Sequence, residues 1–227
     1  AASITQSSGL AVELRVVSTR GDRIRDRPLA EVGGKGLFTL ELEEGLRDGS
    51  LDLAVHSLKD LPTDDPEGLC LGAIPQREDP RDCLVGLSLD ELPKGARVGT
   101  GSLRRRAQIL ALRPDLEIAD IRGNVETRLR KRDEGQYAST ILAVAGMNRL
   151  GIVRHDARPF SVEQMVPAVG QGALGIQCRT DDGELLGALA TIQHEPTRRA
   201  VDAERAFLAA YGGGCNVPAA CHVHLDN

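Results

Sequence analysis

The sequence predicts an α/β protein of two domains, and two features of the chain support that prediction. Short apolar segments with strand character alternate with segments whose apolar residues recur at helical spacing. After a Pro-, Asp- and Gly-rich loop at residues 62–68 and one further strand, the pattern begins again near Asp79. This order favours mainly parallel sheets, with a ligand site in the cleft between the two domains.

The first part of the chain contains three strand signals and one helix signal. The strands expected here are residues 12–17, 51–55 and 69–74. A helix is expected to open at Gly33–Gly36, because Phe38, Leu42 and Leu46 recur at i, i+4 and i+8. Gly49 is suited to the C′ position and is expected to end this helix.

The second part repeats the scheme with clearer helix signals. The strands expected here are residues 97–99, 116–121, 140–144 and 173–178. Ser102 is suited to cap a helix that carries Leu103 and Leu110 and that Pro114 ends. Further helices are expected after residues 122–124, up to residue 150 and from residue 196 to residue 211.

The composition indicates an intracellular globular protein. Hydrophobic residues make up 41% and charged residues 27% of the 227 residues, and the formal net charge of −5 argues against general nucleic-acid binding. The longest apolar run, Ile141–Ala145, is too short to cross a bilayer, and no secretory leader opens the chain. Five Cys without a C-x-x-C pair argue against a disulfide framework and against a metal site.

Arginine dominates the basic residues, since Lys occupies only four of the 28 basic positions. Arg104, Arg105 and Arg106 fall in the first turn of an expected helix, where a bound anion would offset the local positive potential. Arg122 and Arg128 lie at the next strand-to-helix turn. Two such turns indicate a polyanionic ligand. The alternative is a solvated basic turn.

Three further positions are candidates by residue type alone. Asp60 closes a strand, where its carboxylate could stabilise a cation or move a proton, or could simply form a turn. His56 is better explained as a packing residue than as a general base. Cys215 follows three Gly, so its thiol is expected to be accessible, and both a covalent role and an incidental one stay open. Gly33–Gly36 lacks the spacing of a phosphate-binding loop.

Eight segments together resemble the porphobilinogen deaminase family, in that family's order and over nearly the whole chain. They are Val32–Phe38, Val55–Pro62, Arg77–Arg81, Ser102–Arg105, Ile121–Asn124, Leu142–Gly146, Ala168–Ala173 and Gly213–Pro218. The resemblance implies two domains of the periplasmic-binding-protein type (type II), the first interrupted by the second, and a small α+β third domain. Domain 1 would comprise residues 1–75 and 172–191, domain 2 residues 79–168, and the start of domain 3 residues 195–227.

The reaction that the resemblance implies is the head-to-tail polymerisation of porphobilinogen, with release of ammonia, to the linear tetrapyrrole hydroxymethylbilane. This transferase reaction belongs to tetrapyrrole and heme biosynthesis. It is primed by a dipyrromethane cofactor, which a thioether would hold to Cys215. Each pyrrole carries an acetate and a propionate, which is consistent with an arginine-rich site.

The resemblance also implies the roles of individual residues. Asp60 and Lys59 would be the catalytic residues: Asp60 matches the catalytic Asp and would stabilise the cation left when ammonia departs. The cofactor would be bound by Ser57, Lys59, Thr100, Ser102, Arg104, Arg105, Arg122, Asn124, Arg128 and Arg205. The substrate would be bound by Lys35, Phe38, Arg149 and Gln171. Lys35 and Phe38 would lie on the loop that covers the cleft.

Compared with the family pattern, the chain lacks the N-terminal strand and most of the C-terminal domain. Two alternatives therefore stay open beside the enzyme: an inactive truncated isoform, and a non-catalytic anion-binding module on the same scaffold. The resemblance further implies a monomer that binds neither nucleic acid nor membrane. A cytoplasmic location is expected, or an organelle if a transit peptide has been removed.

Overall fold

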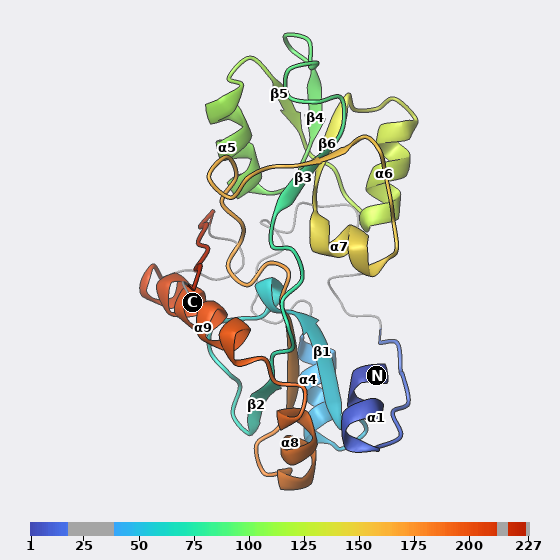
Figure 1. Ribbon diagram of the computed structural model, residues 1–227, viewed down its shortest axis with the longest axis vertical. Coiled ribbons are helices and arrows are strands. Elements are labelled where there is room, and N and C mark those ends of the chain that lie inside the picture. Colours follow the sequence, from blue (N-terminus) through green and yellow to red (C-terminus); the bar gives the residue numbers. More distant parts are fainter. Residues whose placement is uncertain (18–38, 213–217, 226–227) are drawn as a thin grey trace. The chain divides into compact units, whose positions relative to one another are not determined.

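The computed structural model describes residues 1–17, 39–212 and 218–225, which form two compact α/β units (Figure 1). Unit 1 takes its described residues from Ala1–Arg77, Ala173–Val217 and Val223–Asn227. Unit 2 comprises Glu78–Gly172 together with the described part of Pro218–His222. The predicted α/β class, with a discontinuous first part, is therefore confirmed. The assignment of residues 195–227 to a third domain stays a prediction.

Unit 1 contains a three-stranded sheet in which the last strand lies in the middle. Its elements are α1 (Ala2–Ser8), α4 (Leu40–Arg47), β1 (Leu53–Ser57), η1 (Leu58–Asp60), β2 (Leu69–Ala73), β8 (Leu174–Arg179), α8 (Gly183–Ala190) and α9 (Glu195–Ala210). The strand order is β1-β8-β2, and β8 pairs antiparallel with both neighbours. Leu58, Leu71 and Val201 belong to one buried cluster, which joins η1 and α9 to the sheet.

Unit 2 contains a five-stranded sheet in the order β5-β4-β6-β3-β7. Its elements are β3 (Asp82–Gly86), β4 (Arg97–Gly99), α5 (Leu103–Leu112), β5 (Glu117–Ala119), α6 (Val125–Asp133), β6 (Ser139–Ala143), α7 (Val144–Arg149) and β7 (Ala157–Pro159). β4 pairs parallel with β5 and β6, whereas β3 pairs antiparallel with β6 and β7.

Successive side chains of the central strands β3 and β6 point to opposite faces of this sheet. They therefore contribute to a hydrophobic core on each face. Leu84 and Ile141 join Ile109 of α5 in one cluster. Val85 and Leu142 join residues of α6 and α7 in the other cluster. Helix α5 therefore covers one face, and α6 with α7 covers the opposite face (Figure 1). Strands buried on both faces read as apolar runs, as residues 140–144 did in the sequence.

Several expected elements match the structure within a few residues. Ser102 caps α5, Gly49 follows the end of α4 with a φ of 75°, and α9 carries Pro at its start. The part of the expected first helix around residues 33–38 lies outside the described residues.

Two expectations are wrong. Residues 12–17 form no strand: the Leu14 and Val16 side chains are 77% and 97% exposed, and a local pattern cannot supply the neighbouring strand that a ladder requires. The sheets are not mainly parallel, because among the described strands only β4, β5 and β6, which α5 and α6 join, pair in parallel. In addition, α8, β3 and β7 were not expected, since each is short and carries a weak periodic signal.

The core of unit 2 yields a matched stability test within one helix. Ile109 is completely buried, whereas Leu103 on the same helix is 53% exposed. We expect Ile109→Ala to lower the free energy of unfolding by about 2–5 kcal/mol, because it leaves a cavity. Leu103→Ala should change it by less than about 0.5 kcal/mol. Urea denaturation measures both values, and equal losses would contradict the core assignment.

Candidate active site

The parallel strands of unit 2 bring two helix starts to one edge of its sheet. Because β4 and β5 run in the same direction, their carboxyl ends meet there, and α5 and α6 begin just beyond them. Ser102 accepts a hydrogen bond from the backbone N–H of Arg105 at 3.4 Å, and Asn124 accepts one from Thr127 at 2.9 Å. These caps explain why the chain turns into helices at both positions.

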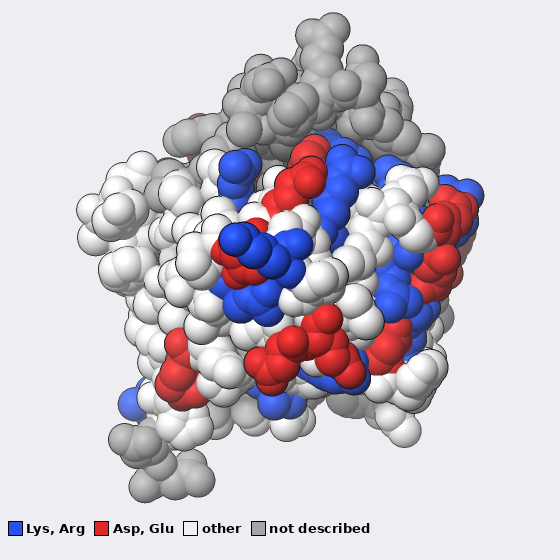
Figure 2. Space-filling view, turned by 90° about the horizontal axis from the view of Figure 1, so that it is seen from above, with Lys and Arg blue, Asp and Glu red and all other residues white. Residues whose placement is uncertain are grey.

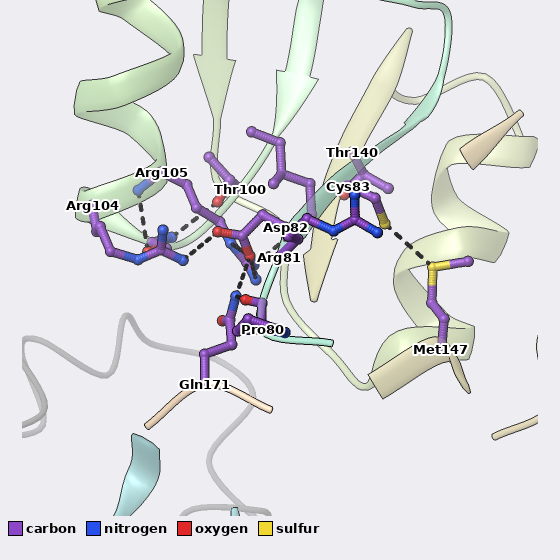
Figure 3. A network of polar contacts seen from close by, with 12 residues as sticks. Pro80, Arg81, Asp82, Cys83, Thr100, Arg104, Arg105, Thr140, Met147 and Gln171 are labelled. Atoms are coloured by element: carbon purple, nitrogen blue, oxygen red, sulfur yellow. Dashed lines mark hydrogen bonds and ion pairs between the residues drawn. The ribbon is translucent and has the colours of Figure 1, made fainter. Parts of the chain in front are cut away.

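Asp82, at the first position of β3, holds the side chains of Arg104 and Arg105 at this edge (Figure 3). Its Oδ2 accepts a hydrogen bond from Arg104 Nη2 at 2.6 Å. Its Oδ1 accepts from Arg105 Nη2 at 2.7 Å and Nε at 3.0 Å, and from Gln171 Nε2 at 2.8 Å. Both guanidinium groups also donate to the backbone, Arg104 to Val166 O and Arg105 to Ile141 O.

The electrostatics of this group follow from its burial. Asp82 is 0% exposed, and Arg104 and Arg105 are each 6% exposed. Burial alone would raise the pKa of Asp82, but the charges of Arg105 and Arg104 outweigh it and hold the pKa below the ordinary 3.8. Burial lowers the pKa of Arg104, and Asp82 opposes that shift. The charged forms of Asp82, Arg104 and Arg105 therefore depend on one another.

The sequence reasoning missed Asp82 as a partner of these arginines. It expected Arg104 and Arg105 to face a ligand's carboxylates, whereas the structure shows that an internal carboxylate already binds both. Asp82 directly follows the Arg77–Arg81 motif. The short apolar run Cys83–Val85 directly after Asp82 was the available signal, though a weak one, because a carboxylate at the start of a buried strand requires cationic partners.

Other predicted residues of unit 2 lie at or near the same edge. Arg122 and Arg128 are half-buried, and Arg128 Nε donates to Gly123 O at 2.8 Å. Thr100 is buried, and its hydroxyl accepts the Ser102 backbone N–H at 3.2 Å. Thr100, Ser102 and Asn124 therefore shape the two turns that present the arginines.

Gln171 and Arg149 lie near the point where the chain leaves unit 2. Gln171 is 1% exposed, and its amide donates to Pro80 O at 2.8 Å as well as to Asp82. Arg149 Nη2 donates to Gly172 O at 2.7 Å. Burial lowers the pKa of Arg149, against the effect of Glu78. Gln171 is thus part of the Asp82 network in this structure.

In unit 1, a short 3-10 turn presents Lys59 and Asp60 directly after β1. Buried side chains before and after the pair, Leu58 and Leu61, anchor the turn, and the Leu58 N–H donates to Ala173 O at 3.0 Å. Asp60 is exposed at the end of the turn, and Lys59 is half-buried. The sequence pattern of apolar residues on both sides of Lys-Asp accounts for this arrangement.

Arg205 of α9 holds the loop that follows this turn. Its Nη2 donates to Pro62 O at 2.8 Å and to Thr63 O at 3.1 Å, and the residue is 9% exposed. One position earlier, Glu204 is 0% exposed and forms an ion pair with Arg77 at 2.7 Å. Among the predicted site residues, Ser57 is exposed at the end of β1, whereas Lys35, Phe38 and Cys215 lie outside the described residues.

His56 is a packing residue. It is 7% exposed, and its Nε2 lies 3.1 Å from Gln177 Oε1 on the neighbouring strand β8. Burial lowers the pKa of His56 from its ordinary 6.5, and the Gln177 hydrogen bond opposes this shift. The structure thus agrees with the interpretation from the sequence.

Basic side chains elsewhere on the molecule lie close to acidic ones. Figure 2 shows one face on which Lys and Arg are interspersed with Asp and Glu. In unit 2, Arg113 pairs with Asp115 at 2.8 Å, and Arg154 pairs with Asp133 and Asp156 at 2.8 Å each. The described residues contain no helix of the length and apolarity needed to span a membrane.

Comparison with known families matches most of the chain to one family. The family described as "Porphobilinogen deaminase, dipyromethane cofactor binding domain" matches residues 1–187. The chain belongs to the porphobilinogen deaminase family. The family's enzymes are transferases of tetrapyrrole biosynthesis, and the matched domain is the one that binds their dipyrromethane cofactor. The expected family, enzyme class and cofactor are therefore confirmed.

Curated relatives named porphobilinogen deaminase cover almost all of this chain. The protein of Nitratidesulfovibrio vulgaris strain Hildenborough is 56% identical over 214 residues, which are 93% of this chain and 68% of that one. The protein of Roseiflexus sp. strain RS-1 is 52% identical over 221 residues, 96% of this chain and 73% of that one. The porphobilinogen deaminase family therefore extends over nearly the whole sequence.

Solved structures with a similar trace are far more distant in sequence. The methionine-binding protein MetQ has 15% identity and a TM-score of 0.47, and the match covers 74% of this chain and 80% of that one. The periplasmic VFT2 domain of Bordetella pertussis BvgS has 14% identity and a TM-score of 0.43, with 92% and 79% covered.

The buried His56 makes stability depend on pH. As pH falls through 6.5, the unfolded chain binds a proton at this residue while the folded chain does not, so the free energy of unfolding decreases. Urea denaturation measures the difference in the free energy of unfolding between about pH 7 and about pH 5. We expect His56→Gln to lose the part of this difference that protonation of His56 causes. His155→Gln, which changes an exposed His, should keep the wild-type difference. A wild-type difference in His56→Gln would refute the assignment.

Proposed function

We propose that the arginines at the edge of the unit 2 sheet and Asp60 of unit 1 carry out the polymerisation of porphobilinogen to hydroxymethylbilane. The observation that carries this proposal is the gathering of cationic side chains at two adjacent helix starts in a chain of the porphobilinogen deaminase family. Such an edge suits a ligand with several carboxylates, because backbone N–H groups and guanidinium groups both favour anions there.

The donor set fits a dipyrromethane, which carries an acetate and a propionate on each of its two rings. Arg104, Arg105, Arg122 and Arg128 supply cationic donors, and the starts of α5 and α6 add partial positive charge. When bound, the cofactor supplies the terminal pyrrole carbon to which substrate units are added. The arginines bind and orient carboxylates, and Thr100, Ser102 and Asn124 fix the turns that carry them.

Asp60 is assigned the stabilisation of positive charge on the substrate. Departure of ammonia from porphobilinogen leaves a cation whose charge is shared with the pyrrole nitrogen, and a fixed carboxylate lowers the energy of that state. The anchored turn at residues 58–61 supplies the fixed position. Lys59 and Ser57, its neighbours along the chain, are assigned contacts with ligand carboxylates.

Residues outside the two helix starts and the turn at residues 58–61 are assigned ligand contacts as well. Lys35, Phe38, Arg149 and Gln171 are assigned to substrate, and Arg205 to the cofactor. Cys215 is assigned the covalent thioether. We further propose a monomeric enzyme that acts on the small molecule porphobilinogen alone, without nucleic acid or membrane. A cytoplasmic location is supported by the bacterial origin of the relatives.

Replacement of Asp60 tests its role directly. In the full-length protein, Asp60→Asn should retain the melting temperature and reduce turnover of porphobilinogen by at least ~10²-fold, the usual effect of losing a positioned charge. Asp65→Asn, an exposed carboxylate in the following loop, is the matched control and should keep normal turnover. Comparable turnover in both variants would remove Asp60 from the mechanism.

Intact mass tests whether Cys215 carries the cofactor. Protein from a host that makes porphobilinogen should carry the added mass of two linked pyrrole units and should react with an aldehyde reagent for pyrroles. Cys215→Ser should lose both signals and activity, whereas Cys221→Ser should keep them. An unmodified mass in active full-length protein would overturn the assignment. A mass-modified protein without turnover would instead favour an inactive isoform.

A further inference from the structure

Asp82 is the buried carboxylate that binds both arginines of the α5 start. Two guanidinium groups, each 6% exposed, lie next to one another at the positive end of α5. Their mutual repulsion and their burial both oppose this arrangement. The single carboxylate of Asp82, hydrogen-bonded to both, offsets these costs.

We infer that Asp82 is a positioning residue, which fixes the guanidinium groups of Arg104 and Arg105 so that they meet the carboxylates of the pyrrole ligand in a set orientation. This inference rests on the proposed function, because it takes the two arginines as ligands for those carboxylates. Asp82 itself does not touch the ligand. It acts through the two arginines, and Gln171 fixes it in turn.

The hydrogen bonds are consistent with Asp82 holding the two arginines while the arginines bind the ligand. In the described part of the chain, Arg105 commits one hydrogen on each of its three guanidinium nitrogens, and Arg104 commits one on each of two. A guanidinium has five N–H donors, so each arginine keeps further donors for a ligand. Those donors point in fixed directions, because Asp82 and a backbone carbonyl hold each planar group at more than one nitrogen.

The backbone around Asp82 is fixed as well. Gln171 Nε2 bridges Pro80 O and Asp82 Oδ1, each at 2.8 Å. Asp82 O accepts the N–H of Phe160 at 2.9 Å. The carboxylate therefore has a single orientation within unit 2, and it transmits that orientation to both arginines.

Replacement of Asp82 separates positioning from simple charge attraction. Asp82→Asn removes one negative charge, so attraction alone predicts tighter binding of a polyanion and a lower KM. Positioning predicts the opposite, because the arginines lose their fixed orientation. Asp82→Glu keeps the charge but displaces the carboxylate by one methylene, so attraction alone predicts a normal KM and positioning predicts a raised one.

The experiment measures KM and kcat for porphobilinogen, the fraction of protein with the cofactor mass, and the melting temperature, all in the full-length enzyme. We expect both Asp82 variants to raise KM by roughly 10-fold or more, the effect of weakening one charge-assisted hydrogen bond, and to lower the fraction with cofactor. Asp115→Asn is the matched control, since Asp115 binds Arg113 at two nitrogens in the same unit. It should keep the wild-type KM and fraction with cofactor.

A normal or lower KM in Asp82→Asn, or a normal KM in Asp82→Glu, would overturn the inference. Should Asp82→Asn fail to fold, Asp82→Glu decides by the same criterion. Arg105→Lys tests the proposed function separately, because Lys keeps the charge but lacks the planar donors. Normal KM and loading in Arg105→Lys would contradict the ligand role of Arg105. An impaired Arg105→Lys beside normal Asp82 variants would refute the positioning role alone.

Discussion

A buried carboxylate between two guanidinium groups organises the arginine site of unit 2. Asp82 begins β3, Arg104 and Arg105 begin α5, and Ile141 O in β6 receives a further bond from Arg105. Val166 O and Gln171 bring the last segment of the unit to the same point. One ionic group therefore joins two strands, a helix and a loop of unit 2.

Unit 1 also contains a buried carboxylate that binds a guanidinium group, in this case of a single arginine. Glu204 of α9 is fully buried, and both its oxygens accept hydrogen bonds from Arg77, at 2.7 and 3.1 Å. Glu204 Oε1 also accepts the N–H of Val223 at 3.0 Å. Next to it, Arg205 donates to two carbonyls of the loop that follows Asp60. In both units, internal hydrogen bonds therefore fix arginine side chains before any ligand binds.

Much of the fold was predictable because local signals were strong. Ser102, Pro114 and Gly49 mark helix ends through backbone rules that hold in any context, and buried runs such as residues 140–144 mark strands. Strand direction was not predictable in this way, because pairings such as β1 with β8 join segments more than a hundred residues apart, and no periodicity encodes a partner.

The sequence predicted which arginines belong to the candidate site, but it did not predict the contacts between the site residues. The sequence identified Arg104 and Arg105 as members of an anion site, since residue type and helix position are local properties. It could not identify Asp82 as their partner, because that contact spans more than twenty residues and depends on β3, an element with a weak signal. The contact of the Gln171 amide with Asp82 was not predictable for the same reason, because 89 positions separate the two residues in the sequence.

The central place of β8 in the unit 1 sheet bears on how the chain is made. β1 and β2 leave the ribosome early, yet each of them pairs with β8 rather than with the other. All of Glu78–Gly172 is synthesised before Leu174, so unit 2 can fold while both strands of unit 1 still lack their neighbour. Over that interval, β1 and β2 expose strand edges that another chain could pair with. Synthesis that stops before Leu174 would leave the anchored turn at residues 58–61 without the Ala173–Arg179 segment on which it rests.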